Sequence, residues 1–369
     1  ICLLLCLSLV LLSACGRKSD NIRFGAADIG GMYYAFASSF SGAVSKDTSD
    51  YKFEVKNTAG SAAHLRLLSD KYIDLGIAQA DLIKDAYDGT GYFNGNVCNG
   101  YKAVAALYTE ACQIVVKANS DIKTIDDLQG KKICIGAEES GTEINAKQIL
   151  ELSGLNSKLV EMANLDYTDA AKQLANGRID AFFCTAGVQT TVISELTKEC
   201  RIKILNIDDK CIKKLITAYP YYCKYEIPAN TYAGQTESVN TIGVKSVLLA
   251  SDNLSKNAVK QFTEIFFKHS KDLQYATSLE LITDEKTAVS GIDIPFHPGA
   301  AAYYKENEEL YENSIRYLSD SRSSRSGTFT WKLFKKKNKL FGKILYSGTC
   351  YRRIAICYLY LYMLYHGNY

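Results

Sequence analysis

Short runs of small residues recur in this chain where a predicted strand gives way to a predicted helix. Four such turns occur, at 28–31, 60–61, 140–142 and 185–187. The first four N–H groups of a helix have no partner within it, and the helix dipole adds partial positive charge there. A helix N-terminus built from Gly, Ser and Thr therefore suits a carboxylate or a phosphate. One such turn alone is more simply an ordinary capped helix, so the prediction of an anion site depends on several of them meeting.

The clearest turn lies in residues 133–154, ICIGAEESGTEINAKQILELSG. Residues 133–135 form an apolar run that ends at a glycine, as in a strand covered on both faces. Ser140 and Glu143 have the spacing of a capping box, which predicts a helix beginning just after Ser140. Gly154 suits the position just past the end of that helix.

Strand and helix patterns alternate through the body of the chain, which predicts an α/β fold. The segments 73–77 (IDLGI) and 179–183 (IDAFF) share an Ile-Asp-apolar pattern and suggest two lobes of similar build. Two apolar strands, 103–107 and 113–116, are separated by a polar break without a helix, which is typical of a hinge crossing between lobes. A return crossing is predicted at strand 241–249.

Further elements are predicted from helical periodicity. Met32, Phe36, Phe40 and Val44 recur every four residues and mark the inner face of a helix. Residue Asp81 is predicted to cap the helix after strand 73–79. Residues 219–235 are predicted to be irregular. One long helix is predicted over 254–276, with these inward residues: Val259, Phe262, Ile265, Phe266 and Leu273.

Charge and cysteine usage exclude several protein classes. Of the 43 Lys and Arg and the 40 Asp and Glu, ten basic and one acidic residue lie in 319–369, which leaves 33 basic and 39 acidic residues elsewhere. The mildly acidic body has no electrostatic footprint for nucleic acid. Irregular cysteine spacing without a C-x-x-C pair predicts neither a disulfide framework nor a zinc site. The seven cysteines of the body are Cys98, Cys112, Cys134, Cys184, Cys200, Cys211 and Cys223.

Both ends of the sequence differ from the body. Residues 1–15 are apolar and read as a secretory leader, too short for a mature membrane span. Residues 12–15 (LSAC) resemble the bacterial lipobox, so Cys15 is predicted to be lipidated, with 16–20 as a tether; a plain signal peptide is the alternative. The basic, Tyr-rich tail at 319–369 is predicted to be either disordered or not native coding sequence, or else to lie on a membrane surface.

Taken together, several segments resemble the TAXI family, the extracytoplasmic solute-binding proteins of TRAP transporters. The clearest matches read IDLGIAQAD, ESGTEINA, IPANTYAGQ and IPFHPGA, and the resemblance covers residues 21–318 in order. It implies a two-lobed periplasmic-binding-protein fold of type II, with two crossings and a ligand cleft between the lobes. The predicted first lobe comprises 21–108 and 241–318, and the second 109–240. The ligand class it implies is a carboxylate, foremost glutamate, glutamine or a related dicarboxylate.

The turns contain no Lys or Arg, so backbone amides, hydroxyls and helix dipoles would hold the anion. Glu110, at the predicted hinge, could accept a ligand ammonium; a solvated hinge charge is the alternative. Asp28 departs from the family pattern, and a carboxylate facing the cleft there would repel an anion. The predicted ligand-binding residues are Gly31, Met32, Tyr33, Ser61, Gln79, Glu110, Ser140, Thr142, Asn145, Gly187 and Tyr232, the last covering the cleft.

The sequence therefore predicts a lipid-anchored, extracytoplasmic solute-binding protein that delivers a small carboxylate to TRAP permease subunits. It is expected to act as a monomer, without metal, cofactor or nucleic acid. A binding protein of an ABC importer or sensor system is one alternative, and a structural lipoprotein is another. An enzyme on the same fold is not favoured, because none of the four histidines belongs to a legible nucleophile–base pair.

Overall fold

The fold is built on a ten-stranded sheet in the computed structural model, which describes residues 20–308. The strands are β1 (Asp20–Gly25), β2 (Tyr51–Lys56), β3 (Leu75–Gln79), β4 (Tyr101–Lys117), β5 (Lys132–Cys134), β6 (Glu161–Ala163), β7 (Ala181–Ala186), β8 (Ile202–Ile204), β9 (Tyr222–Ile227) and β10 (Val239–Ser251). Their main order is β2-β1-β3-β10-β4-β7-β5-β6, while β8 pairs with β4 and β9 with β10.

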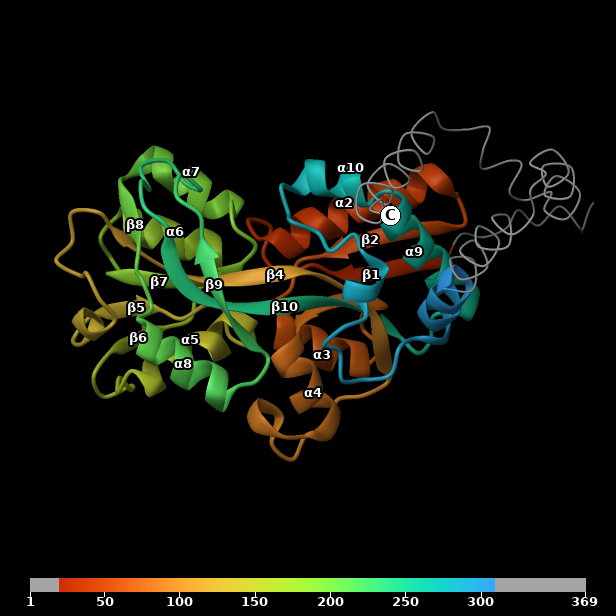
Figure 1. Ribbon diagram of the computed structural model, residues 1–369, viewed down its shortest axis with the longest axis horizontal. Helices are drawn as coiled ribbons and strands as arrows, with labels where there is room; N and C mark the ends of the chain where they lie inside the picture. Colours follow the sequence, from red (N-terminus) through yellow and green to blue (C-terminus); the bar gives the residue numbers. More distant parts are fainter. Residues whose placement is uncertain (1–19, 309–369) are drawn as a thin grey trace, which may run out of the picture. The chain divides into compact units, whose positions relative to one another are not determined.

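The two longest strands, β4 and β10, run antiparallel to each other and cross between two lobes (Figure 1). The C-terminal part of β10 pairs with β3, whereas the C-terminal part of β4 pairs with β7 and β8. The first lobe thus contains β1–β3 and the second contains β5–β9. The predicted two-lobed α/β fold with two crossings is confirmed.

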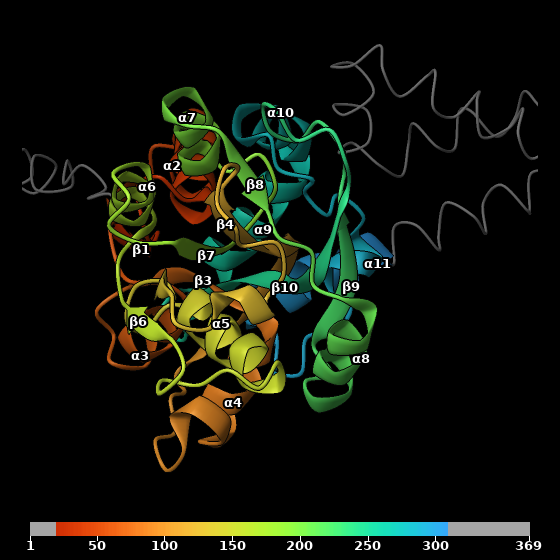
Figure 2. The same cartoon turned by 90° about the vertical axis from the view of Figure 1, so that its left-hand side faces the viewer.

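Helices cover both faces of the sheet in each lobe (Figures 1 and 2). Those of the first lobe are α2 (Met32–Asp47), α3 (Ser61–Ser69), α4 (Ala80–Asp88), α9 (Lys256–Lys268), α10 (Ser270–Thr277) and α11 (Glu285–Ala288), with the 3-10 turn η1 (Gly91–Phe93). Those of the second are α5 (Gly141–Leu152), α6 (Tyr167–Ala175), α7 (Thr191–Glu199) and α8 (Asp209–Ala218), with η2 (Asp126–Leu128).

The helix patterns that depend on local sequence are confirmed. Helix α5 begins at Gly141, and the Ser140 hydroxyl accepts the backbone N–H of Glu143 at 3.0 Å. Gly154 follows the end of that helix at φ +81°, a left-handed conformation that favours glycine. The predicted inner face of α2 is buried against the sheet and against Phe262 and Phe266 of α9.

The polar break predicted at the first crossing is wrong. Strand β4 continues without interruption, and its residues 108–110 pair with 244–246 of β10. Tyr108 and Glu110 are buried and bond within the protein, so their polarity does not bring the backbone into solvent. A polar side chain that faces an internal cavity leaves the strand ladder intact.

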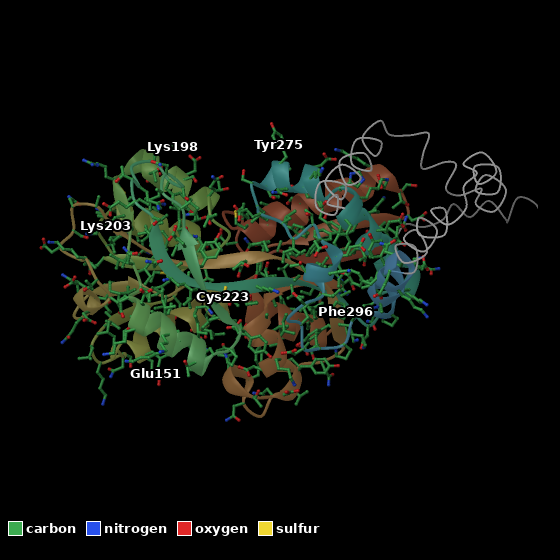
Figure 3. All side chains as sticks on the ribbon, viewed as in Figure 1. Glu151, Lys198, Lys203, Cys223, Tyr275 and Phe296 are labelled. Carbon is green, nitrogen blue, oxygen red and sulfur yellow. The ribbon has the colours of Figure 1, made fainter. Side chains whose placement is uncertain are left out.

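Two other predicted elements differ in the structure. The long helix over 254–276 is divided at His269 into α9 and α10, and His269 lies 3.1 Å from Asp47 of α2. The predicted inward residues are nevertheless all buried, while Tyr275 of α10 points into solvent (Figure 3). The stretch 219–235 contains strand β9, because its backbone pairs with β10.

The two ends of the chain and its cysteines were also the subject of predictions. The leader at 1–15 with Cys15, the tether up to residue 19 and the tail at 319–369 lie outside the described residues. Within 20–308, no helix is long and apolar enough to cross a membrane. The sequence left open a bridge among Cys200, Cys211 and Cys223, but all seven body cysteines are free, and Cys223 is the exposed one on β9 (Figure 3).

A buried polar cluster of Asp81, Asn145 and Tyr222 joins the two lobes. The Asn145 amide of α5 donates to the Tyr222 hydroxyl at 2.7 Å, and both groups lie 3.5 Å from Oδ2 of Asp81. Burial raises the pKa of the Asp81 carboxyl to about 7. The predicted capping role of Asp81 is wrong: the N-cap of α4 is Gln79, and Asp81 instead reaches the second lobe.

Asp81→Asn should make the free energy of unfolding less sensitive to pH. The Asp81 pKa rises from 3.8 to about 7 on folding, so the folded state holds the proton more tightly. Stability therefore falls as pH rises through that window, and the loss is complete above it. An amide cannot ionise, so the decline between pH 5 and pH 8 should shrink by on the order of 2 kcal/mol.

Urea denaturation of wild type and variant at the two pH values measures this effect. Asp88→Asn is the matched control, since Asp88 lies exposed at the end of the same helix. An identical decline in Asp81→Asn and wild type would contradict the assignment.

Candidate functional site

A cavity of about 580 Å³, its open mouth included, lies between the lobes. The first lobe lines it with the turn before α2, the turn before α3, the end of β3 and the middle of β4. The second lobe lines it with the turn before α5, the start of α6 and the end of β7. Four helix N-termini therefore meet at one cavity, those of α2, α3, α5 and α6, although the side chain of the N-cap Asp166 already accepts an N–H of α6.

Eight of the eleven predicted ligand-binding residues line this cavity. They come from five segments that are distant in the sequence. These residues are Gly31, Met32, Tyr33, Ser61, Gln79, Glu110, Ser140 and Thr142.

The other three predicted residues do not line the cavity. Asn145 lies one turn into α5, where its amide faces Asp81 and Tyr222. Gly187 follows the last cavity residue of β7 and packs against Leu279. Tyr232 is buried, and its hydroxyl donates to Gln113 at 2.6 Å instead of covering the cleft.

Several residues that line the cavity are not among the predicted ligand-binding residues. Asn57 and Thr58 lie in the polar turn before α3, and Asp166 and Tyr167 start α6. Thr185, at the end of β7, also lines the cavity. The first four follow a strand and precede or begin a helix, which is the signal that identified the other turns, whereas Thr185 is the penultimate residue of β7.

The N-termini of α3 and α5 approach each other closely across the cavity. Gly60, the N-cap of α3, has φ +133°, and a Cβ there would lie 3.3 Å from Cα of Ser140. A Cβ at Gly141 would lie 2.4 Å from Oε1 of Gln79, so a side chain at this position would displace Gln79. The two glycines allow the helix ends to converge, and the backbone N–H of Ala63 donates to the Glu139 carbonyl across the lobes at 3.1 Å.

Glu110 lies at the base of the cavity and is 2% exposed, which rules out the alternative of a solvated hinge charge. Gln79 Nε2 donates to Oε2 of Glu110 at 2.9 Å, and the Tyr33 hydroxyl donates to the same oxygen at 3.3 Å. Burial raises the pKa of Glu110 to about 8, although these donors act to lower it. The carboxyl group is therefore predominantly protonated at neutral pH.

Other polar groups position the cavity wall. His64 is buried, and its Nδ1 lies 2.7 Å from the carbonyl of Ile77. Its Nε2 lies at 2.5 Å from the hydroxyl of Thr58, and desolvation lowers the His64 pKa to about 4. A neutral imidazole thus orients Thr58. On the opposite wall, the Thr142 hydroxyl lies 2.6 Å from the Tyr167 hydroxyl, which also donates to the Thr185 carbonyl.

Two polar atoms of the cavity lining are buried without a protein partner, namely Oε1 of Gln79 and Oγ1 of Thr185. Such atoms are costly unless a ligand or water satisfies them. No group of three or more His, Cys, Asp or Glu side chains suited to a metal ion occurs within residues 20–308.

Comparison with solved structures relates this architecture to periplasmic binding proteins. The PhnD1 protein of Prochlorococcus marinus, solved with methylphosphonate, matches with a TM-score of 0.51 and 13% identity over 80% of this chain and 98% of that chain. The periplasmic aliphatic sulphonate binding protein SsuA of Escherichia coli matches with a TM-score of 0.40 and 18% identity, over 81% and 94% of the two chains. The alkanesulfonate-binding protein of Xanthomonas axonopodis pv. citri matches with a TM-score of 0.44 and 16% identity, over 81% of this chain and 94% of that chain.

Identities this low indicate a shared fold and leave the ligand open. A family model gives the more direct relationship, because it matches residues 24–307, which include both lobes and every element that lines the cavity. The chain belongs to the NMT1-like family.

Proposed function

We propose that this protein is an extracytoplasmic solute-binding protein that captures a small carboxylate in the cavity between its lobes. One observation carries the proposal: the N-termini of α2, α3 and α5 meet at one cavity. Within residues 20–308, no Lys, Arg or His side chain lines this cavity. Unpaired backbone N–H groups at helix ends bind anions without a basic side chain. Membership of the NMT1-like family and the periplasmic-binding-protein fold support capture rather than catalysis.

The carboxylate is best accommodated where α3 and α5 converge. The Ser61 hydroxyl and the first two amides of each helix lie there, since the Ala63 and Glu143 N–H groups already bond to Glu139 and Ser140, and Tyr33 and Gln79 border the same space. Closure of the lobes excludes water, which strengthens each of these hydrogen bonds. We propose that the eight predicted residues lining the cavity contact the solute, with glutamate and glutamine among the candidate ligands.

The delivery system is proposed from the sequence motifs. The lipobox-like residues 12–15 support lipid anchoring at Cys15, and the TAXI-like segments support a TRAP permease as the membrane partner. The same fold would serve an ABC importer, which is the alternative partner. Copurification of the membrane subunits with the lipidated protein distinguishes the two systems, because TRAP and ABC permeases differ in composition.

Small carboxylates should raise the melting temperature of the protein. A ligand that binds only the folded state stabilises it by about 2.7 kcal/mol at one hundred times its Kd. A thermal-shift screen of amino acids, monocarboxylates and dicarboxylates measures this effect, with sugars as negative controls. The absence of a shift with every carboxylate would refute the proposed ligand class.

Tyr33→Phe should weaken binding of the best carboxylate about tenfold, or about 1.4 kcal/mol. The lost hydroxyl lies in the cavity, 3.3 Å from both Ser61 Oγ and Glu110 Oε2. Tyr232→Phe is the matched control: its hydroxyl contacts Gln113 and Thr190 outside the cavity, so this variant should lose stability but not affinity. Calorimetric titration of both variants with the best carboxylate measures the two affinities. If Tyr33→Phe and Tyr232→Phe bind it equally tightly, the proposed site is contradicted.

A further inference from the structure

The side chain of Gln79 connects the base of the cavity to the N-terminus of α5. Gln79 is 1% exposed, and its Nε2 donates to Oε2 of Glu110 at 2.9 Å. Its Oε1 is buried without a partner in the described part of the chain and lies beside Gly141, where a Cβ would come within 2.4 Å of it. An oxygen that only accepts hydrogen bonds therefore faces the helix end proposed for the solute carboxylate, which is also an acceptor.

Glu110 is a buried carboxyl group whose contacts are all with uncharged groups. Besides Gln79 of β3, the hydroxyls of Tyr33 on α2 and Tyr108 on β4 lie 3.3 and 3.5 Å from its two oxygens. Val244 is its partner on β10. An ionised Glu110 thus has hydrogen-bond donors but no counter-charge, which makes burial of its charge costly.

The titratable groups around Glu110 add no positive charge. Asp81 of α4 raises the pKa of Glu110, and Glu110 in turn raises the pKa values of Tyr167 on α6 and Cys184 on β7. His64 of α3 stacks on Tyr33, but desolvation lowers its pKa to about 4, so the ring is neutral. The surroundings therefore favour the protonated form of Glu110 over the carboxylate.

A half-turn of the Gln79 amide about its last bond exchanges the positions of its oxygen and nitrogen. Oε1 then faces Glu110, and Nε2 faces Gly141 at the start of α5. The protonated carboxyl group donates its O–H to Oε1, whereas a carboxylate would meet this oxygen as a second acceptor. The turned amide therefore requires the proton on Glu110, and it gives the cavity an additional N–H donor beside the helix ends.

We propose that Glu110 keeps its proton when the solute is bound and, through Gln79, supplies the solute carboxylate with an amide N–H donor. Glu110 is a positioning residue in this respect, because it acts on the solute through Gln79. Ionised Glu110 holds Nε2 at the base of the cavity and leaves Oε1 toward the anion, which weakens binding. The inference rests on the proposed function and deepens it, because capture of the carboxylate becomes dependent on one proton.

Affinity for a carboxylate should fall about tenfold between pH 7 and pH 9. Burial raises the pKa of Glu110 to about 8, so most molecules hold this proton at pH 7 and only about a tenth hold it at pH 9. The apparent affinity falls with the fraction of molecules that can bind. Calorimetric titration with glutarate and with L-glutamate measures the ratio, for whichever probe binds more tightly at pH 7.

Glu110→Gln should remove this pH dependence. A glutamine cannot ionise, and its NH2 group can donate to Oε1 of Gln79 in place of the carboxyl O–H. The ratio of affinities at pH 7 and pH 9 should therefore stay near one, and any ionisation of the probe affects wild type and variant alike. Asp81→Asn is the matched control: this buried acid outside the cavity has a pKa of about 7, and its variant should keep the tenfold ratio.

Proton uptake tests the same linkage in the wild-type protein. The proton and the carboxylate each raise affinity for the other by the same factor, so binding at pH 9 should take up about one proton per carboxylate. Calorimetry in two buffers with different ionisation enthalpies measures this number.

The outcomes separate this inference from the proposed function. A carboxylate that binds equally well at pH 7 and pH 9, or without proton uptake at pH 9, would overturn the role of Glu110 and leave carboxylate capture standing. A tenfold fall that persists in Glu110→Gln, or disappears in Asp81→Asn, would also overturn it. Failure of both probes to bind at pH 7 would refute the carboxylate function and this inference with it.

Discussion

The antiparallel pairing of β4 with β10 is the constraint on which the cavity depends. Both strands belong to both lobes, so the ladder between them fixes where the helix N-termini of one lobe stand relative to those of the other. Tyr108 and Glu110 are two residues apart on β4 and therefore share a face, and the Tyr108 hydroxyl lies 3.5 Å from the Glu110 carboxyl group, which lines the cavity. A one-residue slip would turn these side chains to the opposite face of the sheet.

The cavity presents backbone dipoles and buried polar side chains, and no basic residue of the described part of the chain lines it. The converging ends of α3 and α5 require Gly60 and Gly141, because a Cβ at either position would meet the opposite lobe. Burial raises the pKa values of two acids in this region: Glu110 accepts hydrogen bonds from side chains, whereas Asp28 accepts one from a backbone amide.

The sequence patterns whose predictions are confirmed are those that depend on interactions between residues close together in the chain. The capping box of Ser140 and Glu143, the apolar face of α2 and the small-residue turns all depend on neighbours within one turn of a helix. The failures concern elements held by distant partners. Residues 222–227 form a strand because β10 pairs with them, and residues 108–112 stay in β4 for the same reason. The division of α9 from α10 at His269 likewise occurs beside Asp47, more than two hundred residues away.

The sequence by itself determined the fold class and the helix N-termini at which a solute could bind, since turn chemistry and hydrophobic period are properties of short segments. The places of Ser61, Gln79 and Ser140 at strand and helix ends also predicted them as site residues, and all three line the cavity. Only the tertiary structure decided that Asn145 faces Asp81, that Tyr232 faces Gln113, and that Tyr167 belongs to the cavity wall. The direction of a side chain near a lobe boundary depends on how the two lobes pack, and that packing is a sum of contacts between residues distant in the chain.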